Sequence, residues 1–232
     1  MSTELDKIVD SKVEELKNKD YVRAVALVGS YSREKNQSHN DIDFYVIVEG
    51  EWRKRKTFQY EEEVLEIFYN SLEWAKSYFD QNDNWYMYHW MKNKDVRYDP
   101  ENLFEELDNL SDEFKQRQFD INEERISYTV WDYIQDIESD DVAQKRFMMY
   151  QTFDYILKKH YLIKKIPLVK PNYRLEKLKE FDGYMYKLSQ EFLTSSSTYE
   201  KNKKLEKIID HFTKTLGCKP SPNWETEKEE FS

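Results

Sequence analysis

The sequence predicts a small α/β unit with a mixed sheet, followed by an all-α helical bundle. Two observations lead to this fold class. Apolar runs of strand length, rich in β-branched and aromatic residues, occur at about 23–28, 42–48 and 63–69. After about residue 110 such runs stop, and apolar residues recur at helical spacing instead.

The domain boundaries follow from this change of pattern. We place the α/β domain at 1–110, the helical domain at 111–219 and a tail at 220–232. A chain of 232 residues is long enough for two domains with sizeable cores.

The first domain opens with an amphipathic helix, since apolar residues recur at helical spacing from Leu5 to Leu16. After the three strands, Asn70 and Glu73 predict the start of a helix over 72–79. A short strand at 96–98 would close the sheet before another helix at 101–109.

The second domain is predicted to contain only helices. Ser197 and Glu200 form a capping box before the last helix, and Gly217 is its expected C-terminal stop. The predicted helices cover 112–138, 141–165, 172–194 and 199–216.

Two acids lie on the second predicted strand. Side chains alternate across a strand, so Asp41 and Asp43 share a face while Ile42 points into the core. Paired carboxylates repel unless a cation lies between them, and oxygen ligands suit Mg²⁺. Upstream, the Gly29 backbone can approach a ligand closely, and Ser30 offers a hydroxyl and an N–H for phosphate oxygens. The pattern predicts a site for a metal-bound triphosphate.

Gly29-Ser30, ten residues, then Asp41-Ile42-Asp43 resembles the signature of the polymerase-beta-like nucleotidyltransferase superfamily. The resemblance is close over about 25 residues. It implies a third carboxylate on the next strand, where Glu66 lies among apolar residues, and a basic residue at Arg33. The chain departs from the pattern at Glu34, where many relatives have Gly, and at Asn40, where Ser is frequent. The third acid, often Asp, is here the longer Glu66, which could act as metal ligand, as base, or as both.

The resemblance implies a Mg²⁺-dependent enzyme, with two ions, that moves AMP from ATP onto an acceptor hydroxyl. The implied catalytic and metal-binding residues are Asp41, Asp43 and Glu66, with Gly29, Ser30 and Arg33 at the nucleotide. An α/β domain followed by a helical bundle resembles the aminoglycoside and lincosamide nucleotidyltransferases, and so implies antibiotic resistance. Such relatives often form homodimers, although no stripe of residues identifies an interface. The base preference, ATP or GTP, does not follow from these residues.

Two other functions stay open. One is a protein-adenylylating nucleotidyltransferase of the antitoxin type, although those enzymes are often close to the minimal domain. The other is a nucleotide-binding module without catalysis, against which the intact pair of acids counts.

Composition narrows the class of partner. With 36 basic and 46 acidic residues the net charge is −10, which argues against a nucleic-acid partner and suits a small cationic acceptor. The one cysteine, Cys218, allows no intrachain disulfide and fits a reducing compartment. Without an apolar signal core or a membrane-length apolar run, we expect a cytoplasmic protein and no membrane association.

Other polar and aromatic features have simpler interpretations. The basic run 52–56 is typical of a solvated loop or helix face. The aromatic segment 85–90 favours core over a wall for a purine or sugar. Asp132 and Asp136 share a helix face, which is either a solvated stripe or a site for ammonium groups. The four histidines are scattered and follow no ligand spacing.

Overall fold

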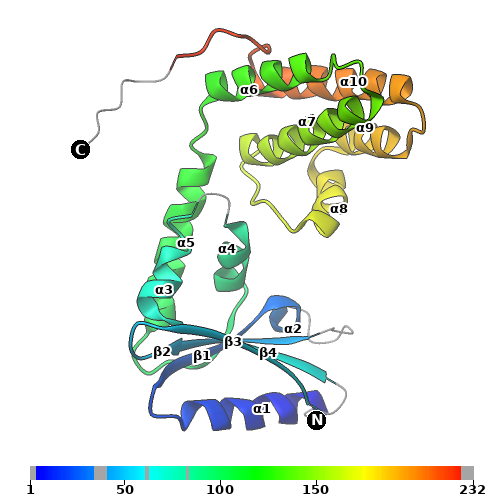
Figure 1. Cartoon of the computed structure of the whole chain (residues 1–232). Helices are drawn as coiled ribbons and strands as arrows, with labels where there is room; N and C mark the ends of the chain where they lie inside the picture. The colour runs from blue at the N-terminus through cyan, green and yellow to red at the C-terminus, as the bar shows by residue number, and fades with distance from the viewer. Residues whose placement is uncertain (1–3, 34–40, 61–62, 82–83, 226–232) are drawn as a thin grey trace. The chain divides into compact units, whose positions relative to one another are not determined.

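The computed structural model describes residues 4–33, 41–60, 63–81 and 84–225. It confirms the predicted fold class, with a five-stranded mixed sheet in the first part of the chain and helices alone after it (Figure 1). Among the described residues, no helix combines the length and the apolar character that crossing a membrane requires.

The chain divides into two compact units, Met1–Gln118 and Phe119–Ser232. The helix α5, Leu103–Phe119, runs without interruption through residue 110, where the sequence places a boundary. The sequence places the boundary where the strand signals end. The two compact units instead divide near the end of α5.

The sheet of the first unit has the strand order β3-β4-β2-β1-β5. β2 and β4 are parallel, and the other neighbouring pairs are antiparallel. The strands are β1 Val22–Val28, β2 Ile42–Val48, β3 Arg53–Tyr60, β4 Glu63–Ser71 and β5 Asp95–Tyr98.

Five helices accompany this sheet: α1 Glu4–Lys17, α2 Gly29–Arg33, α3 Leu72–Ser77, α4 Trp85–Lys92 and α5. Ser71, not Asn70, caps α3, and its side chain accepts the Trp74 N–H. Asn70 remains in β4, where its Oδ1 accepts a hydrogen bond from the Tyr78 hydroxyl at 3.3 Å. The strand pairing therefore takes precedence over the local capping preference of Asn70.

Both faces of the sheet are covered. On one face, Phe44 and Val46 of β2 pack with Val9 and Val13 of α1 in a fully apolar core. On the other face, Tyr45 lies 5.8 Å from Trp90 of α4, measured between ring centroids. The alternation along β2 thus directs Phe44 and Val46 to the layer under α1, and Tyr45 to the aromatic layer under α4.

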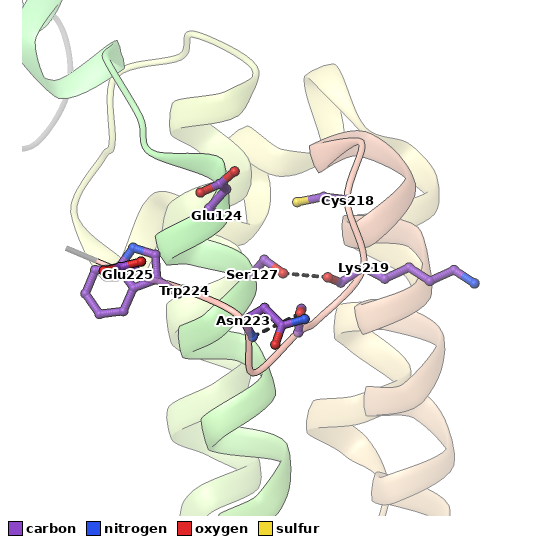
Figure 2. A pocket seen from close by; sticks show the side chains of 8 residues that line it. Glu124, Ser127, Cys218, Lys219, Asn223, Trp224 and Glu225 are labelled. Atoms are coloured by element: carbon purple, nitrogen blue, oxygen red, sulfur yellow. Dashed lines mark hydrogen bonds between the residues drawn. The ribbon is translucent and has the colours of Figure 1, made fainter. Parts of the chain in front are cut away.

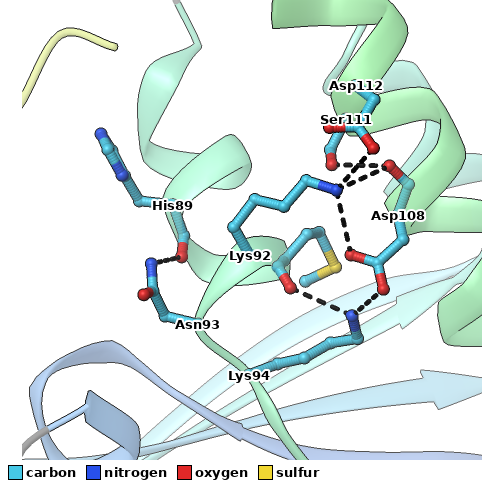
Figure 3. A network of polar contacts seen from close by, with 8 residues as sticks. His89, Lys92, Asn93, Lys94, Asp108, Ser111 and Asp112 are labelled. Carbon is cyan, nitrogen blue, oxygen red and sulfur yellow. Dashed lines mark hydrogen bonds and ion pairs between the residues drawn. The ribbon is translucent and has the colours of Figure 1, made fainter. Parts of the chain in front are cut away.

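Lysines around the end of α4 hold this helix to α5 (Figure 3). Lys92 Nζ lies 2.8 Å from Asp112 Oδ2 and donates to the Asp108 carbonyl at 3.3 Å. Lys94 forms an ion pair with the Asp108 carboxylate and donates to the Met91 carbonyl at 3.0 Å. These contacts fix α4 and the aromatic residues that it carries over the sheet.

The second unit contains α6 Glu123–Asp136, α7 Val142–Ile163, α8 Pro171–Phe181, α9 Gly183–Thr194 and α10 Thr198–Leu216. α10 packs against α7 and α9, α8 against α9, and α6 against α7. The predicted ends of α10 are confirmed, because the Ser197 side chain accepts the Glu200 N–H and Gly217 has a left-handed φ of 85°.

Two predicted helices of this unit differ from the observed ones. The range 112–138 is divided between α5 and α6, and Asn122 caps α6 by accepting the Arg125 N–H. The range 172–194 is divided into α8 and α9 at Asp182, whose side chain caps α9. Both breaks occur at Asn or Asp residues, whose short side chains satisfy the free N–H groups of a new helix.

Candidate active site

Three carboxylates meet at one end of β2 and β4. Asp43 and Glu66 are partners in the parallel register of these strands, and Asp41 directly precedes β2. One oxygen atom from each of the three lies within 4.8 Å of the others. Asp43 is buried, whereas Asp41 and Glu66 are half-buried. Three converging carboxylate oxygens form a donor set that fits a hard divalent cation such as Mg²⁺.

The Gly29 turn passes directly beside this cluster. β1 ends at Val28, which pairs with Asp43, and Gly29 follows with a φ of 78°. A Cβ at position 29 would collide with the Asp43 carboxylate. Glycine is therefore required here both by the backbone conformation and by the close approach to the acid. Ser30, the next residue in the chain, is half-buried.

The short helix α2 is anchored to α1. The buried Tyr31 donates a hydrogen bond from its hydroxyl to Asp6 Oδ1 at 3.0 Å. Burial, together with this contact to Asp6, raises the pKa of Tyr31 to about 12. Arg33 ends α2, and its side chain lies outside the part of the chain that the structure describes.

Glu66 is held by residues of the neighbouring strand β3. Thr57 is its partner in the antiparallel register, and the Thr57 hydroxyl donates to Glu66 Oε1 at 3.3 Å. Arg55 Nη2 donates to Glu66 Oε2 at 2.6 Å. The basic run is thus an exposed edge strand, not the solvated loop or helix face that the sequence predicts. Strand alternation directs Arg55 to the face that carries the acids.

An aromatic side chain of α4 lies within electrostatic range of the acids. Partial burial and the charges of Asp43, Asp41 and Glu66 raise the pKa of Tyr86 to about 12. The Tyr86 ring lies 4.5 Å from Trp90, and Trp90 in turn lies 4.7 Å from Phe68 of β4. Tyr86 is nevertheless 42% exposed, unlike its buried neighbours in α4. The aromatic segment 85–90 is therefore mainly core, as predicted, but the Tyr86 ring is partly exposed.

The structure brings five of the six residues singled out from the sequence into one region: Gly29, Ser30, Asp41, Asp43 and Glu66. Sequence reasoning assigned Arg55 to a solvated loop or helix face, favoured a core role for the segment that contains Tyr86, and did not single out Thr57. The alternation of β3 could have placed Arg55 and Thr57 on one face, if the segment had been predicted as a strand. No sequence signal indicates the position of Tyr86, because it depends on how α4 packs on the sheet.

The second unit carries a surface pocket with a volume of about 540 Å³. As Figure 2 shows, Ser127 of α6 and the segment after α10 line it, and the Ser127 hydroxyl contacts the Lys219 carbonyl. Neither the three acids nor any histidine lines this pocket. Its residues form no group of metal ligands or catalytic side chains, so it does not compete with the acid cluster as a catalytic site.

The acidic stripe of α6 is exposed at both Asp132 and Asp136 within the second unit. The same unit contains a further group of ligand type that the sequence does not indicate. His160 and His211 both contact Asp182, although 22 and 29 residues separate them from it.

Comparisons with known proteins agree with this geometry. Residues 12–102 match the family model described as polymerase beta, nucleotidyltransferase. The fold is similar to the crystal structure of a nucleotidyltransferase-like protein from Exiguobacterium sibiricum 255-15, with a TM-score of 0.52 and 12% sequence identity. That likeness covers 91% of this chain and 78% of the other. No curated protein sequence matches the chain.

The matched range ends at Asn102, just before α5, and it includes all three acids, the Gly29 turn and the whole sheet. Over residues 12–102 the first unit is therefore similar to the polymerase beta nucleotidyltransferase family, and this match and the fold together support a nucleotidyltransferase.

Proposed function

We propose that this nucleotidyltransferase moves AMP from ATP onto a hydroxyl group of a small cationic acceptor, of the aminoglycoside class first and the lincosamide class second. The observation that carries the proposal is the convergence of Asp41, Asp43 and Glu66 beside the Gly29 turn. A triphosphate needs these two elements next to each other, namely oxygen ligands for its cations and a backbone turn without a side chain.

Asp41, Asp43 and Glu66 would hold Mg²⁺, with two ions in the working site. Their carboxylate oxygens are the hard donors that Mg²⁺ prefers, and the site stays open on the side of Asp41 and Glu66, which are half-buried. Bound Mg²⁺ supplies charge neutralisation on the triphosphate and on the leaving pyrophosphate.

The residues of the chain would position the reactants. The Gly29 backbone and the Ser30 hydroxyl would bind the outer phosphates. The acceptor oxygen then forms a bond to the α-phosphorus, and the bond from that phosphorus to the bridging oxygen breaks, which releases pyrophosphate. The acceptor hydroxyl proton passes to the Glu66 carboxylate, which Arg55 and Thr57 hold in place from β3.

Tyr86 would contact the nucleoside or the acceptor sugar with its exposed ring. The ring is backed by Trp90 at 4.5 Å and stands beside the three acids. With a pKa of about 12, its hydroxyl stays protonated at neutral pH and can donate a hydrogen bond. Stacking on such a ring is worth about 1–3 kcal/mol per base.

The chemistry of the acceptor is inferred from charge. The net charge of −10 disfavours a polyanionic acceptor and favours a cationic one. The exposed acids of α6 supply a negative surface in the second unit that suits ammonium groups. We therefore infer that the helical unit contributes to recognition of the acceptor.

The test is pyrophosphate release by the full chain with Mg²⁺ and each nucleoside triphosphate, against a panel of aminoglycosides and lincosamides. Release that requires one drug class, and that Asp43→Asn abolishes, is the expected result. Transfer onto a co-purifying protein would favour the protein-adenylylating alternative. Triphosphate binding without turnover toward any acceptor would favour the non-catalytic module.

A further inference from the structure

A cluster of two imidazoles and a carboxylate lies inside the helical unit. His160 of α7 and His211 of α10 both direct Nε2 at the same atom, Asp182 Oδ2, at 2.9 Å and 2.8 Å. Asp182 stands at the junction of α8 and α9. One ligand atom from each of the three residues lies within 4.8 Å of the others. Three separate segments of the chain thus contribute to one small site.

The cluster is held in a fixed orientation by its surroundings. The other oxygen of Asp182, Oδ1, accepts the Met185 N–H at 2.8 Å, so Oδ2 is the atom left facing the imidazoles. The His160 ring stacks on Phe181 with a centroid distance of 6.0 Å and an interplanar angle of 22°. The hydrogen bond from Met185 is of the kind that orients carboxylate ligands around metals in proteins.

Burial is graded across the cluster. His160 is completely buried, the Asp182 side chain is 10% exposed and the His211 side chain is 25% exposed. The inner ligand is therefore shielded from water, while the His211 side remains open to an entering ion. The Tyr184 ring packs edge-on against the His211 ring, with 5.0 Å between the ring centroids.

We propose that His160, Asp182 and His211 bind a Zn²⁺ ion, with water in the remaining position. Two imidazole nitrogens and one carboxylate oxygen are a donor set that Zn²⁺ accepts, at bond lengths of about 2.0–2.2 Å. The ion would take the place of the contacts that join each Nε2 to Oδ2. The ligand atoms would move apart around the ion, starting from Nε2–Oδ2 distances of 2.9 Å and 2.8 Å.

The bound ion would clamp three segments of the helical unit together. It would join α7, the α8–α9 junction and α10, which already pack against one another. Because the unfolded chain does not assemble these ligands, binding favours the folded helical unit. This site shares no residue with the carboxylate cluster in the first unit.

The competing explanation is that hydrogen bonds alone join the three residues. The zinc site and the hydrogen-bonded cluster differ in which imidazole nitrogen carries the hydrogen. In the hydrogen-bonded cluster each imidazole donates its Nε2 hydrogen to Asp182. In the zinc site Nε2 is a ligand, and the hydrogen moves to Nδ1. For His160, Nδ1 is buried and has no hydrogen-bond partner among the described residues, so the surroundings do not themselves fix the tautomer.

The first experiment is nitrogen-15 NMR of the imidazoles in the full, uniformly labelled chain during titration with Zn²⁺. The chain has four histidines, so each ring can be assigned. We expect saturable shifts at Nε2 of His160 and His211, with both rings in the Nδ1–H form. Unchanged His160 and His211 signals at saturating Zn²⁺, or shifts confined to the other two histidines, would overturn the proposal.

A matched set of variants checks the site by Zn²⁺ affinity and thermal unfolding. His211→Gln is the preferred change because this residue is the more exposed imidazole, and His89→Gln is its control. Loss of one ligand should weaken Zn²⁺ binding by at least about tenfold, since loss of outer-shell partners alone costs about 10–100-fold. Asp43→Asn should leave this binding unchanged, which separates it from metal at the carboxylate cluster. Equal Zn²⁺ affinity in His211→Gln and His89→Gln would contradict the proposal without any need for the NMR assignment.

Discussion

Asp43 on β2 lies directly opposite Glu66 on β4 in the parallel pairing of these two strands. This register is well determined, because Ile42 and Phe44 on either side of Asp43 are fully buried on the opposite face. A slip by one residue would move the acids into the apolar core and the apolar residues to the site. The same pattern that builds the core therefore also aligns the carboxylates.

Asp43→Asn should abolish most nucleotidyl transfer while the fold is retained. The change preserves the shape of the side chain but removes one charge of the three-carboxylate set. We expect turnover to fall by about 10²–10³-fold or more, as for loss of other electrostatic groups that stabilise a transition state. The free energy of unfolding without divalent ions should be equal or higher, because carboxylate repulsion is relieved. Pyrophosphate release and urea unfolding measure the two effects, and the exposed Asp80→Asn is the control. Equal turnover in the two variants would contradict this role of Asp43.

Gly29→Ala should reduce both stability and activity. The alanine Cβ would collide with the Asp43 carboxylate. The backbone of the alanine would also be held at a strained φ of 78°. Gly217→Ala is a matched control, because Gly217 has a similar φ of 85°. No neighbouring atom lies within 4 Å of the position that its alanine Cβ would occupy. Backbone strain of this kind costs about 1–3 kcal/mol in either variant. Only Gly29→Ala should add a loss of turnover, measured by pyrophosphate release. A Gly217→Ala variant with the same loss would show that strain alone explains the effect.

Arg55→Ala should lower the Mg²⁺ concentration needed for half-maximal activity. Arg55 donates to Glu66 in the structure, and so competes with a cation for this carboxylate. The Arg55 side chain is 61% exposed and Glu66 is 14% exposed, so the pair is largely screened by solvent. A coupling below about 1 kcal/mol corresponds to a change of less than about fivefold. Lys54→Ala, a neighbouring change on the other face of β3, should leave the Mg²⁺ requirement as it is. The idea fails if the two variants respond alike.

Tyr86→Ala should raise the KM for nucleotide or acceptor by about tenfold, through loss of a stacking surface. Tyr86→Phe keeps the ring and should retain most of the affinity. Tyr199→Ala provides a control, because Tyr199 is 65% exposed and lies in the second unit. Steady-state kinetics with each substrate varied in turn identify which ligand contacts the ring. An unchanged KM for both substrates would remove Tyr86 from the site.

Tyr31→Phe should make the free energy of unfolding fall less steeply as the pH rises through the alkaline range. The pKa of Tyr31 is raised from 10.0 to about 12 in the folded chain by burial and by Asp6. The folded state therefore resists deprotonation, and this contribution is complete below about pH 10 and is lost as pH rises toward about 12. Each pH unit in this window removes up to about 1.4 kcal/mol per proton. Urea unfolding between about pH 9 and pH 12 should show a shallower decline for Tyr31→Phe than for the exposed control Tyr199→Phe. Parallel declines would contradict the assignment.

Much of the first unit could be predicted from the sequence, because its signals are local. The apolar runs around Val25, Val46 and Ile67 specify buried strands, and alternation alone places Asp41 and Asp43 on one face. The strand β3 was missed, since its four consecutive basic residues, 53–56, lie at an exposed edge and carry no apolar periodicity. Edge strands often carry charged side chains, because these discourage pairing with another chain.

The missing members of the candidate site depend on tertiary packing. Arg55 reaches Glu66 only through the pairing of β3 with β4, and Tyr86 reaches the acids only through the docking of α4 by Trp90. His160 and His211 are brought to Asp182 by the packing of α7 and α10, over sequence distances that no ligand motif spans. Local sequence pattern therefore predicts the three acids. The residues around the acids, and the histidine cluster at Asp182, follow only from the fold.

The central claim, nucleotidyl transfer at the three carboxylates, is tested most directly with ATP labelled either at the α-phosphate or at the γ-phosphate. The full chain is incubated with Mg²⁺ and the acceptor identified in the panel, beside Asp43→Asn. We predict that the α label becomes attached to the acceptor, that the γ label appears in pyrophosphate, and that the variant does neither. Attachment of the γ label to the acceptor, or equal α-label transfer by Asp43→Asn, would contradict the account.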